Sequence, residues 1–324
     1  MGRSRRSAPC ERATAVSQPP RESAADVAVI GLGAIGLPVA VNLAKAGFVV
    51  QVWNRTGGRA QRAIDQGAVE VVSPADIDAR VVLTVLPDTP QIDEVLAQGL
   101  ESALRPGDVL VVMSTVSPQA VRQLGERLGS SCGAHVVDAP VSGGDVGAWD
   151  ATLSIMIGGE PEPVAACWPI FEAAGSRLRH LGPLGSGQVA KLSNQIIVGA
   201  TLAAIGEAIN LARAAGLDDR MVVEALSGGL AGSRALDTKG EKILSGDFTP
   251  GGAASHQLKD LRYATAAASE LGLAHPLTAA VTELYEQLID SGFGELDQSA
   301  IALLSLPPAS SNGPSRDTTP EEPT

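Results

Sequence analysis

Residues 27–47 read VAVIGLGAIGLPVAVNLAKAG, and they decide the fold of the first half of the chain. The segment opens with an apolar run typical of a buried strand and closes with a helical pattern. Between the two, Gly31, Gly33 and Gly36 form the sequence Gly-x-Gly-x-x-Gly. The first glycine allows a tight turn, the second lets the backbone approach a pyrophosphate, and the third lets helix and strand pack closely. The stretch therefore predicts a strand–turn–helix unit that binds a dinucleotide at the N-terminus of its helix.

Short apolar runs and amphipathic segments alternate after this unit. We expect strands at 27–31, 49–53, 69–72, 81–86, 109–113, 135–138 and 153–158, most of them apolar throughout. Such strands are covered on both faces, and strand–helix alternation produces parallel βαβ units. The prediction for residues 25–187 is therefore an α/β, doubly wound domain of the Rossmann type. The glycine loop residues Gly31, Leu32, Gly33, Ala34, Ile35 and Gly36 are its candidate cofactor contacts.

The pattern changes near Gly187. Residues 188–215 form one long helical pattern that is apolar nearly all round in its middle, and further helical patterns follow at 218–230, 256–272 and 276–291. We expect a long interdomain helix that leads into an all-α domain over 188–305. Residues 1–24 and 306–324 lack a hydrophobic period and are predicted to be disordered tails. The Arg-rich start is compatible with a transit peptide, but its glutamates and paired prolines favour a plain extension.

The composition argues against several classes of protein. With 24 Lys and Arg against 36 Asp and Glu, the net charge of −12 leaves no basic footprint for nucleic acid or an anionic membrane. No apolar run approaches the roughly 20 residues that cross a bilayer, and no signal-peptide stretch stands out. Three scattered cysteines are too few for a disulfide framework or a zinc site. We therefore expect no metal and a cytoplasmic location.

The end of the second predicted strand bears on the choice of cofactor. A carboxylate there would bind the ribose 2′-hydroxyl of NAD, but the sequence is Trp53, Asn54, Arg55 and Thr56. No carboxylate repels a 2′-phosphate at this point, and Arg55 offers it a forked, charge-assisted contact. We predict NADP over NAD, with Asn54, Arg55 and Thr56 as contacts. The alternative is that Arg55 is an ordinary surface arginine.

Four sequence blocks carry a resemblance to a known family. They are GLGAIGLPVAVNLAKAG (31–47), DAPVSGGDVGAWDATLSIMIGG (138–159), GSGQVAKLSNQ (185–195) and the Lys259-Asp260 pair. With these blocks in order between about Val27 and Ile301, the chain resembles the β-hydroxyacid dehydrogenase family. That family includes 3-hydroxyisobutyrate dehydrogenases and tartronate semialdehyde (2-hydroxy-3-oxopropionate) reductases. One departure is Asp150, which stands where the family usually has glycine and suggests a turn that needs positive φ.

The resemblance implies a substrate loop at Ser142, Gly143 and Gly144, which would bind the substrate carboxylate. Two glycines after a serine let backbone N–H groups converge on an anion without interference from Cβ atoms. From these residues alone, without the other blocks, a plain glycine-rich turn is the favoured interpretation.

The resemblance also places the catalytic lysine at Lys191. Asn194 and Gln195 lie three and four residues further on, so all three share one helix face. Burial lowers the pKa of a lysine toward neutrality, which suits it to proton transfer. We therefore expect Lys191 to act as general acid and base, with Asn194 orienting the substrate or the lysine. The alternative is a lysine that snorkels from the helix edge.

Three further positions match the family's cofactor contacts. Leu86-Pro87 would lie beside the adenosine ribose, Thr115 on the nicotinamide side, and Lys259 over the cofactor or substrate. From the residues alone, Pro87 terminates a strand, Thr115 caps a helix and Lys259 is a solvated charge.

Together these features predict an NADP-dependent oxidoreductase that interconverts a small 3-hydroxy acid and its semialdehyde, similar to 2-hydroxy-3-oxopropionate or glyoxylate reductases. A 3-hydroxyisobutyrate dehydrogenase that uses NAD is the alternative within the class. Imine reduction and a non-catalytic NADP-binding scaffold are the alternatives outside it, and Lys191 argues against both. The resemblance further implies a small carboxylate-bearing substrate and a homodimer or homotetramer built through the helical domain.

Overall fold

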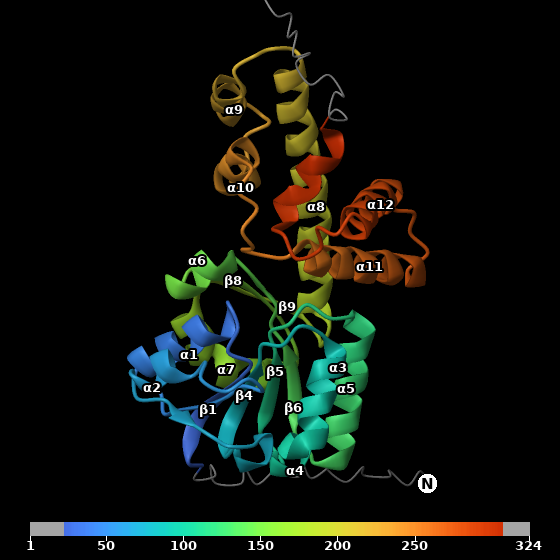
Figure 1. Ribbon diagram of the computed structural model, residues 1–324. Coiled ribbons are helices and arrows are strands. Elements are labelled where there is room, and N and C mark those ends of the chain that lie inside the picture. Colours follow the sequence, from blue (N-terminus) through green and yellow to red (C-terminus); the bar gives the residue numbers. More distant parts are fainter. Residues whose placement is uncertain (1–22, 307–324) are drawn as a thin grey trace, which may run out of the picture.

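The computed structural model describes residues 23–306, and Figure 1 shows a sheet domain below a group of helices. The strands are β1 (Ala25–Ile30), β2 (Val50–Trp53), β3 (Val69–Glu70), β4 (Ala79–Thr84), β5 (Val109–Val112), β6 (His135–Asp138), β7 (Val141–Ser142), β8 (Leu153–Gly158) and β9 (Gly175–Gly182). They form one sheet in the order β3-β2-β1-β4-β5-β6-β8-β7, with β9 beside β8. Neighbours from β3 to β6 are parallel, which confirms the predicted doubly wound Rossmann fold.

Helices cover both faces of this sheet. They are α1 (Gly36–Lys45), α2 (Gln61–Ile64), η1 (Pro74–Asp76), α3 (Thr89–Val95), η2 (Leu96–Leu100), α4 (Glu101–Ala103), α5 (Pro118–Ser131), α6 (Gly144–Trp149) and α7 (Pro161–Ala174). Val27 and Val29 of β1 pack into one apolar cluster with α1 and α7, whereas Ala28 and Ile30 pack into the opposite cluster with α3 and α5. This alternation explains why β1 is apolar throughout.

Two strands lie outside the sequence prediction. β7 has only two residues, and β9 reads GSRLRHLG, in which Leu178 is buried while both arginines are exposed. A mostly polar strand at the border of a sheet carries little of the apolar signal that marks central strands. β8 runs antiparallel to β6 and β7, so this border also departs from the parallel pattern.

A second correction concerns the turn before β8. The sequence suggests positive φ at Asp150, but this residue has φ −82° and the left-handed conformation falls on Ala151, at φ +53°. Asp150 follows the last residue of α6 with φ −82° and ψ 0°, and the chain reverses one residue later. The position that is strained for an L-residue is therefore Ala151.

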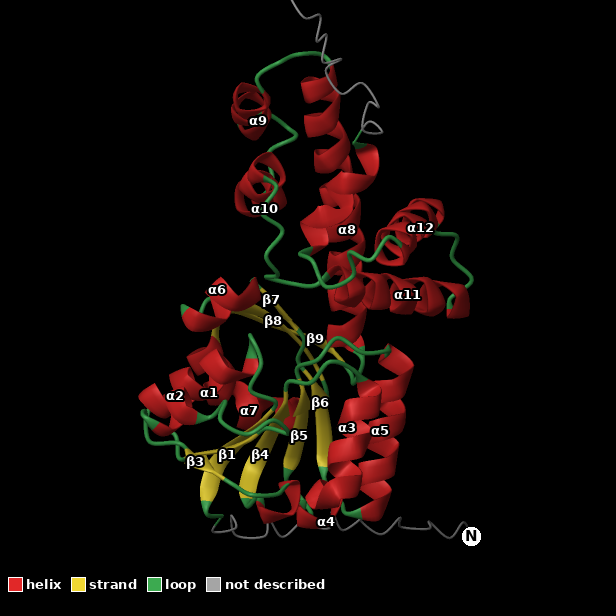
Figure 2. Ribbon diagram, in the orientation of Figure 1, coloured by secondary structure: helices red, strands yellow, loops and turns green. Residues whose placement is uncertain are grey.

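The second half of the described chain is helical. It comprises α8 (Ser186–Ala214), α9 (Asp219–Ser227), α10 (Arg234–Ser245), α11 (Ala254–Glu270), α12 (Pro276–Asp290) and η3 (Gln298–Ser305). Figure 2 shows α8 rising from the sheet with the other helices packed beside it. Leu202 of α8, Leu261 of α11, Tyr285 of α12 and Ile301 of η3 share one buried cluster. The predicted interdomain helix and all-α region are confirmed, and α10 is an addition to the predicted helices.

Helix α8 is also the one helix, among residues 23–306, that is long and apolar enough to cross a membrane by length and composition. Of its most apolar window, 44% is buried inside the protein. The core helix of a soluble protein passes the same criterion, so the finding is weak evidence for a span. The predicted tails lie outside the described residues except for Ser23, Ala24 and Leu306.

Candidate active site

The glycine loop after β1 has the geometry expected of a phosphate-binding turn. Gly31 has φ +94°, and a Cβ atom on it would collide with the carbonyl oxygen of Val85. A Cβ atom on Gly36 would collide with the carbonyl oxygen of Gly31. At Gly33, by contrast, no described atom lies within 4 Å of the Cβ position. Gly31 and Gly36 are therefore required by the turn itself, whereas Gly33 leaves open space beside the backbone.

The start of α1 fits the phosphates of a dinucleotide. No side chain caps the helix, and its first turn contains no acidic residue. Leu37 N and Val39 N already bond the carbonyl oxygens of Gly33 and Ile35, so the helix offers an anion chiefly the positive end of its dipole. Within the loop Leu32 is buried, Ala34 is exposed and Ile35 is half-buried. Leu32 N donates a hydrogen bond to Asn54 Oδ1 at 2.8 Å, which fixes the loop to the end of β2.

The predicted 2′-phosphate contacts lie at the end of β2. Both ends of the Asn54 side-chain amide are hydrogen-bonded. Its oxygen accepts from Leu32 N of the glycine loop, and its nitrogen donates to the carbonyl oxygen of Thr56 at 2.8 Å. Arg55 is exposed and forms an ion pair with Glu94 at 3.3 Å. Arg62 lies over the ring of Trp149, with its guanidinium 3.8 Å from the ring centroid. Arg55 is thus held by a surface ion pair of small energy, which a phosphate can replace.

The loops after β4 and β5 form the next part of the same edge. Leu86 N donates to Ser114 Oγ at 3.0 Å, which ties the Leu86-Pro87 segment to the loop after β5. Lys259 reaches this loop from α11 and donates to the carbonyl oxygen of Thr115 at 2.5 Å. Lys259 is therefore an interdomain contact rather than a solvated charge.

The predicted substrate loop joins β7 to α6. Ser142 is half-buried, whereas Gly143 and Gly144 are exposed and have φ +138° and +66°. At Gly144 no described atom lies within 4 Å of the Cβ position. The side chain of Leu153 packs against Gly143, with Cδ2 3.2 Å from the Cβ position, so the open backbone that suits contact with a small anion is at Gly144.

Lys191 lies near the start of α8 and is 8% exposed. Its ammonium group makes no hydrogen bond or short ion pair within residues 23–306. Burial lowers the pKa of Lys191 below its ordinary value of 10.5, the carboxylate of Asp260 opposes this, and the ammonium of Lys259 adds to it. A buried ammonium group with a lowered pKa is suited to exchange a proton with a bound molecule.

A polar network surrounds this lysine. Asn194 Nδ2 donates to Gln195 Oε1 at 2.9 Å, and Gln195 Nε2 donates to Asp260 Oδ2 at 2.8 Å and to Gln257 Oε1 at 3.0 Å. Lys259 pairs with the other oxygen of Asp260 at 2.8 Å. The network joins α8 to α11, and the charged groups that act on Lys191, Asp260 and Lys259, come from α11.

Two buried residues near the site were not predicted from the sequence. Asp138, at the end of β6, accepts hydrogen bonds from Gly185 N and Gln188 N, both at 2.7 Å. The Gln188 side chain donates to Ser114 O at 2.9 Å and accepts from Val116 N at 3.0 Å. Both residues belong to the quoted sequence blocks, yet no local pattern shows that strand ends and a helix start meet here.

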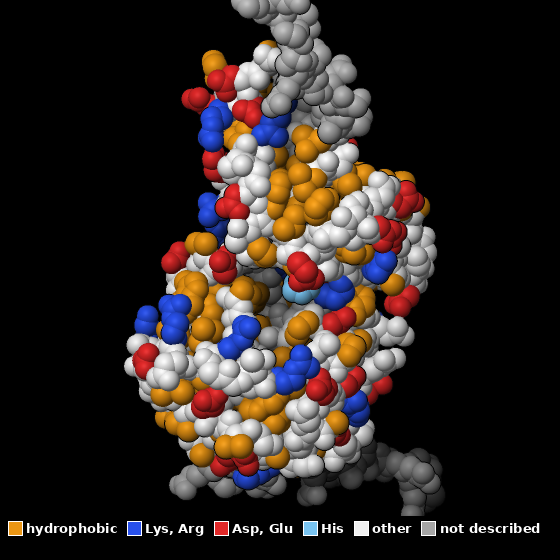
Figure 3. Space-filling model, viewed as in Figure 1, with side chains coloured by type: hydrophobic (Ala, Val, Ile, Leu, Met, Phe, Trp, Pro, Cys, Tyr) orange, Lys and Arg blue, Asp and Glu red, His pale blue; other side chains and the backbone are white. Residues whose placement is uncertain are grey.

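These residues gather at the carboxyl ends of β1, β4, β5 and β6, which is where doubly wound sheets bind dinucleotides. Figure 3 shows the surface hollowed between the sheet domain and the helices, with histidine, lysine and arginine side chains near the rim. The glycine loop and Arg55 come from the sheet domain. Lys191, Asn194 and Lys259 come from the helices on the opposite side.

Comparison with known proteins agrees with this geometry. Residues 26–182 match the family model described as the NAD binding domain of 6-phosphogluconate dehydrogenase. Residues 185–305 match the model described as NAD-binding of NADP-dependent 3-hydroxyisobutyrate dehydrogenase. The 2-hydroxy-3-oxopropionate reductase of Escherichia coli (strain K12) is 38% identical over 276 residues, covering 84% of this chain and 94% of the relative. The chain belongs to the β-hydroxyacid dehydrogenase family.

Solved structures extend the comparison. The 3-hydroxyisobutyrate dehydrogenase of Mycobacterium tuberculosis, described with L-serine, has a TM-score of 0.76 at 29% identity and covers 86% of this chain and 98% of its own. A structure described as Psf3 in complex with NADP+ and 2-OPP has a TM-score of 0.76 at 25% identity, covering 86% of this chain and 99% of its own. This β-hydroxyacid dehydrogenase is an NAD(P)-dependent oxidoreductase that acts on CH–OH groups.

The glycine loop generates a paired prediction. Gly33→Ala should leave the melting temperature within about 2 °C of wild type but weaken binding of the nicotinamide cofactor at least about tenfold, because the added methyl group fills the open space beside the backbone. Gly36→Ala should lower both the melting temperature and the affinity for the cofactor, because its methyl group would displace the carbonyl of Gly31. Thermal unfolding and fluorescence titration with NADPH measure the two effects. Equal cofactor affinity in Gly33→Ala and wild type would contradict the assignment.

Proposed function

We propose that this chain is an NADP-dependent oxidoreductase that interconverts a small 3-hydroxy acid and its semialdehyde, in the manner of a 2-hydroxy-3-oxopropionate or glyoxylate reductase. The observation that carries the proposal is the ammonium group of Lys191, which is buried near the start of α8, makes no hydrogen bond within residues 23–306 and lies within the electrostatic reach of Asp260 and Lys259. The bound nicotinamide would supply or accept the hydride. The chain itself must hold the substrate and move a proton.

Each protein group has a defined task in this proposal. The open backbone at Ser142, Gly143 and Gly144 binds the substrate carboxylate. Lys191 donates a proton to the carbonyl oxygen during reduction and takes it from the hydroxyl during oxidation. Asn194 hydrogen-bonds the substrate oxygen or the lysine, and its bond to Gln195 sets its orientation.

The proposed preference for NADP rests on the end of β2. No carboxylate directly follows Trp53 there. Arg55 is exposed, and binding a phosphate would require it to break only its ion pair with Glu94. Asn54 and Thr56 contribute by holding the loop around it. The structural relative described with NADP+ supports this choice.

The identity of the substrate is proposed from the relatives. The E. coli relative named 2-hydroxy-3-oxopropionate reductase favours a short semialdehyde acid, and the relative named 3-hydroxyisobutyrate dehydrogenase favours the methyl-bearing analogue as second candidate. Both candidate substrates carry a carboxylate close to the carbon that reacts. This carboxylate is the group that the loop at Ser142–Gly144 is proposed to bind. Steady-state assays with a panel of 3-hydroxy acids and semialdehydes, each with NADP(H) and NAD(H), separate the two candidates.

We also propose that the protein is a homodimer or homotetramer and that it is located in the cytoplasm. Val189, Ile197 and Leu211 of α8 are 45%, 66% and 73% exposed, which leaves apolar side chains uncovered along the helical region. Exposed apolar side chains on one element favour contact with another protein surface. Light scattering of the purified full-length chain measures the oligomeric state.

The role of Lys191 is tested by replacement. Lys191→Met keeps an unbranched side chain, one atom shorter, but removes the ammonium group, so kcat should fall about 10²- to 10⁴-fold while NADPH affinity stays within about twofold. The exposed Lys45→Met serves as the matched control and should keep wild-type turnover. Full turnover in Lys191→Met would rule out the proposed acid and base.

The lowered pKa of Lys191 predicts opposite pH dependences in the two directions. Reduction needs the ammonium form, so its kcat should fall as pH rises through a pKa below 10.5, whereas oxidation needs the free amine and should gain rate over the same range. Asp260→Asn removes the charge that raises this pKa, so both limbs should move to lower pH. The test is a pH profile of kcat, measured in both directions. An apparent pKa that is the same in Asp260→Asn and wild type would contradict the prediction.

The cofactor preference is tested at Arg55. Arg55→Gln should weaken NADPH binding at least about tenfold and leave NADH binding unchanged, because only NADPH carries the 2′-phosphate. Arg220→Gln removes another exposed arginine that is paired with a glutamate, Glu241 at 2.8 Å, and should change neither affinity. Isothermal titration with both cofactors provides the measurement. An equal loss for NADH and NADPH would refute the assignment to the phosphate.

A further inference from the structure

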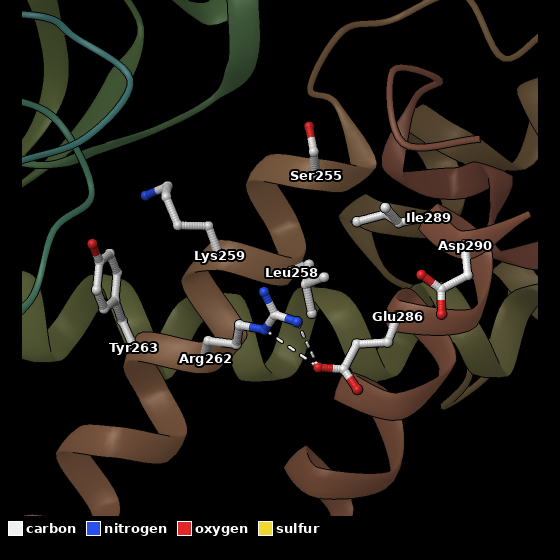
Figure 4. Close-up of a pocket in the computed structure, with 8 residues that line it drawn as sticks. All are labelled: Ser255, Leu258, Lys259, Arg262, Tyr263, Glu286, Ile289 and Asp290. Atoms are coloured by element: carbon white, nitrogen blue, oxygen red, sulfur yellow. Dashed lines mark hydrogen bonds and ion pairs between the residues drawn. The ribbon is translucent and has the colours of Figure 1, made fainter. Parts of the chain in front are cut away.

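Helix α11 meets the sheet domain at two side chains one helical turn apart. Lys259 donates to the carbonyl oxygen of Thr115 in the loop after β5. The hydroxyl group of Tyr263 lies 2.7 and 2.8 Å from the two carboxylate oxygens of Asp88, in the loop after β4. Figure 4 shows Lys259 and Tyr263 leaving α11 toward the same side, whereas Arg262 turns away from them. The helix is thus fixed to two neighbouring strand-end loops.

The loop that carries Asp88 is a wall of the proposed cofactor crevice. A Cβ atom on Gly31 would collide with the carbonyl oxygen of Val85 and lie 2.9 Å from Leu86 Cδ2, so this loop packs directly against the glycine loop. In a doubly wound sheet the crevice opens where β1 and β4 end side by side. The contact between Tyr263 and Asp88 therefore joins the helical region to the edge of that crevice.

The carboxylate of Asp88 is itself held in place. Its Oδ1 accepts a hydrogen bond from Thr89 N at 2.7 Å and so caps α3. Burial and the neighbouring carboxylate raise the pKa of the Tyr263 hydroxyl, which keeps the group protonated as the donor. The ammonium group of Lys259 lies 5.1 Å from the centroid of the Tyr263 ring, so the two anchors support each other.

We propose that Tyr263 is a positioning residue for the nicotinamide cofactor, whose hydrogen bonds to Asp88 hold α11 against the wall of the crevice and slow cofactor release. The proposal rests on the crevice being the cofactor site, as in the proposed function. Because α11 contacts the loops after β4 and β5, it restricts how far these loops can move from a dinucleotide bound beside them. In this proposal, cofactor release is faster when the contact between Tyr263 and Asp88 is broken.

The experiment is removal of one oxygen atom. Tyr263→Phe in the full-length protein should raise the dissociation rate of NADPH about three- to thirtyfold and weaken its affinity by a similar factor, since a half-buried hydrogen bond to a carboxylate is lost. Stopped-flow fluorescence measures release when bound NADPH is displaced by excess NADP+. An unchanged dissociation rate in Tyr263→Phe overturns the proposal.

The chain offers a matched control, because Tyr263 and Tyr285 are its two tyrosines. The Tyr285 hydroxyl is hydrogen-bonded to the carbonyl oxygen of Gln298 at 3.0 Å, entirely within the helical region. Tyr285→Phe should lower the melting temperature but leave the rate of NADPH release unchanged. Tyr263→Phe should speed NADPH release but leave the melting temperature unchanged. Equal acceleration in both variants would mean that loosening the helical region is enough, and it would overturn the specific role.

A second substitution tests the partner. Asp88→Asn can still cap α3 but accepts a weaker hydrogen bond, so it should also speed NADPH release. Combining it with Tyr263→Phe should add little to the effect of Tyr263→Phe alone, because the contact that Asp88→Asn weakens is then already lost. Fully multiplicative effects would show that the two side chains act separately, and would overturn the proposal.

The same measurements separate this proposal from the proposed catalytic role. Release of NADPH needs no chemistry, so Tyr263→Phe should accelerate it equally in a Lys191→Met background. Turnover that survives in Lys191→Met, with faster release in Tyr263→Phe, refutes the catalytic assignment alone. Failure of the wild-type chain to bind NADPH or NADH would overturn both proposals.

Discussion

A buried carboxylate joins the two halves of this protein. Asp138 ends β6 and accepts the backbone N–H groups of Gly185 and Gln188, where α8 begins. Burial raises the pKa of this carboxyl group, and the backbone hydrogen bonds act against that effect. Charge-assisted bonds of this kind stabilise by about 1.5–3 kcal/mol each, and leaving such a carboxylate unpaired would cost more. The start of α8, and with it Lys191, is therefore fixed relative to the sheet.

Gln188 extends this constraint to the nucleotide side. Its side chain bonds the backbone on either side of Thr115, while Leu86 N bonds Ser114 in the same loop. Hydrogen bonds thus connect the ends of β4, β5 and β6 to the first turn of α8. The proton transfer proposed for Lys191 would depend on this order, since a proton donor is useful only when its position relative to the reacting carbon is set.

The surroundings of Lys191 balance two opposing requirements. Burial lowers the pKa of its ammonium group, and the carboxylate of Asp260 prevents that effect from acting alone. Asp260 is in turn shared between Lys259 and Gln195, so its charge is partly satisfied elsewhere. A lysine paired directly with a carboxylate would be held as a permanent cation and would exchange its proton poorly.

Much of this arrangement could be predicted from the sequence, because local patterns carry it. The Gly31–Gly36 loop, the central strands and the long helix each have a periodicity or motif of their own. The polar strand β9, the helix α10 and the bonds of Asp138 and Gln188 could not be predicted in this way. They depend on tertiary contacts between segments that are far apart in the chain, and a single sequence does not show which segments form such contacts. The positive φ at Ala151 was displaced by one residue for the same reason, since the exact end of α6 is set by its packing.

The length of α8 has a mechanical consequence. At 1.5 Å per residue, its 29 residues form a rod about 43 Å long that is gripped by the sheet at one end. A tilt of about 5° at that end, of the size that small shifts between packed helices produce, would swing the far end by roughly 4 Å. A shift at the sheet end of α8, where Lys191 lies, would thereby be amplified at the far end of the helix, which α9 follows.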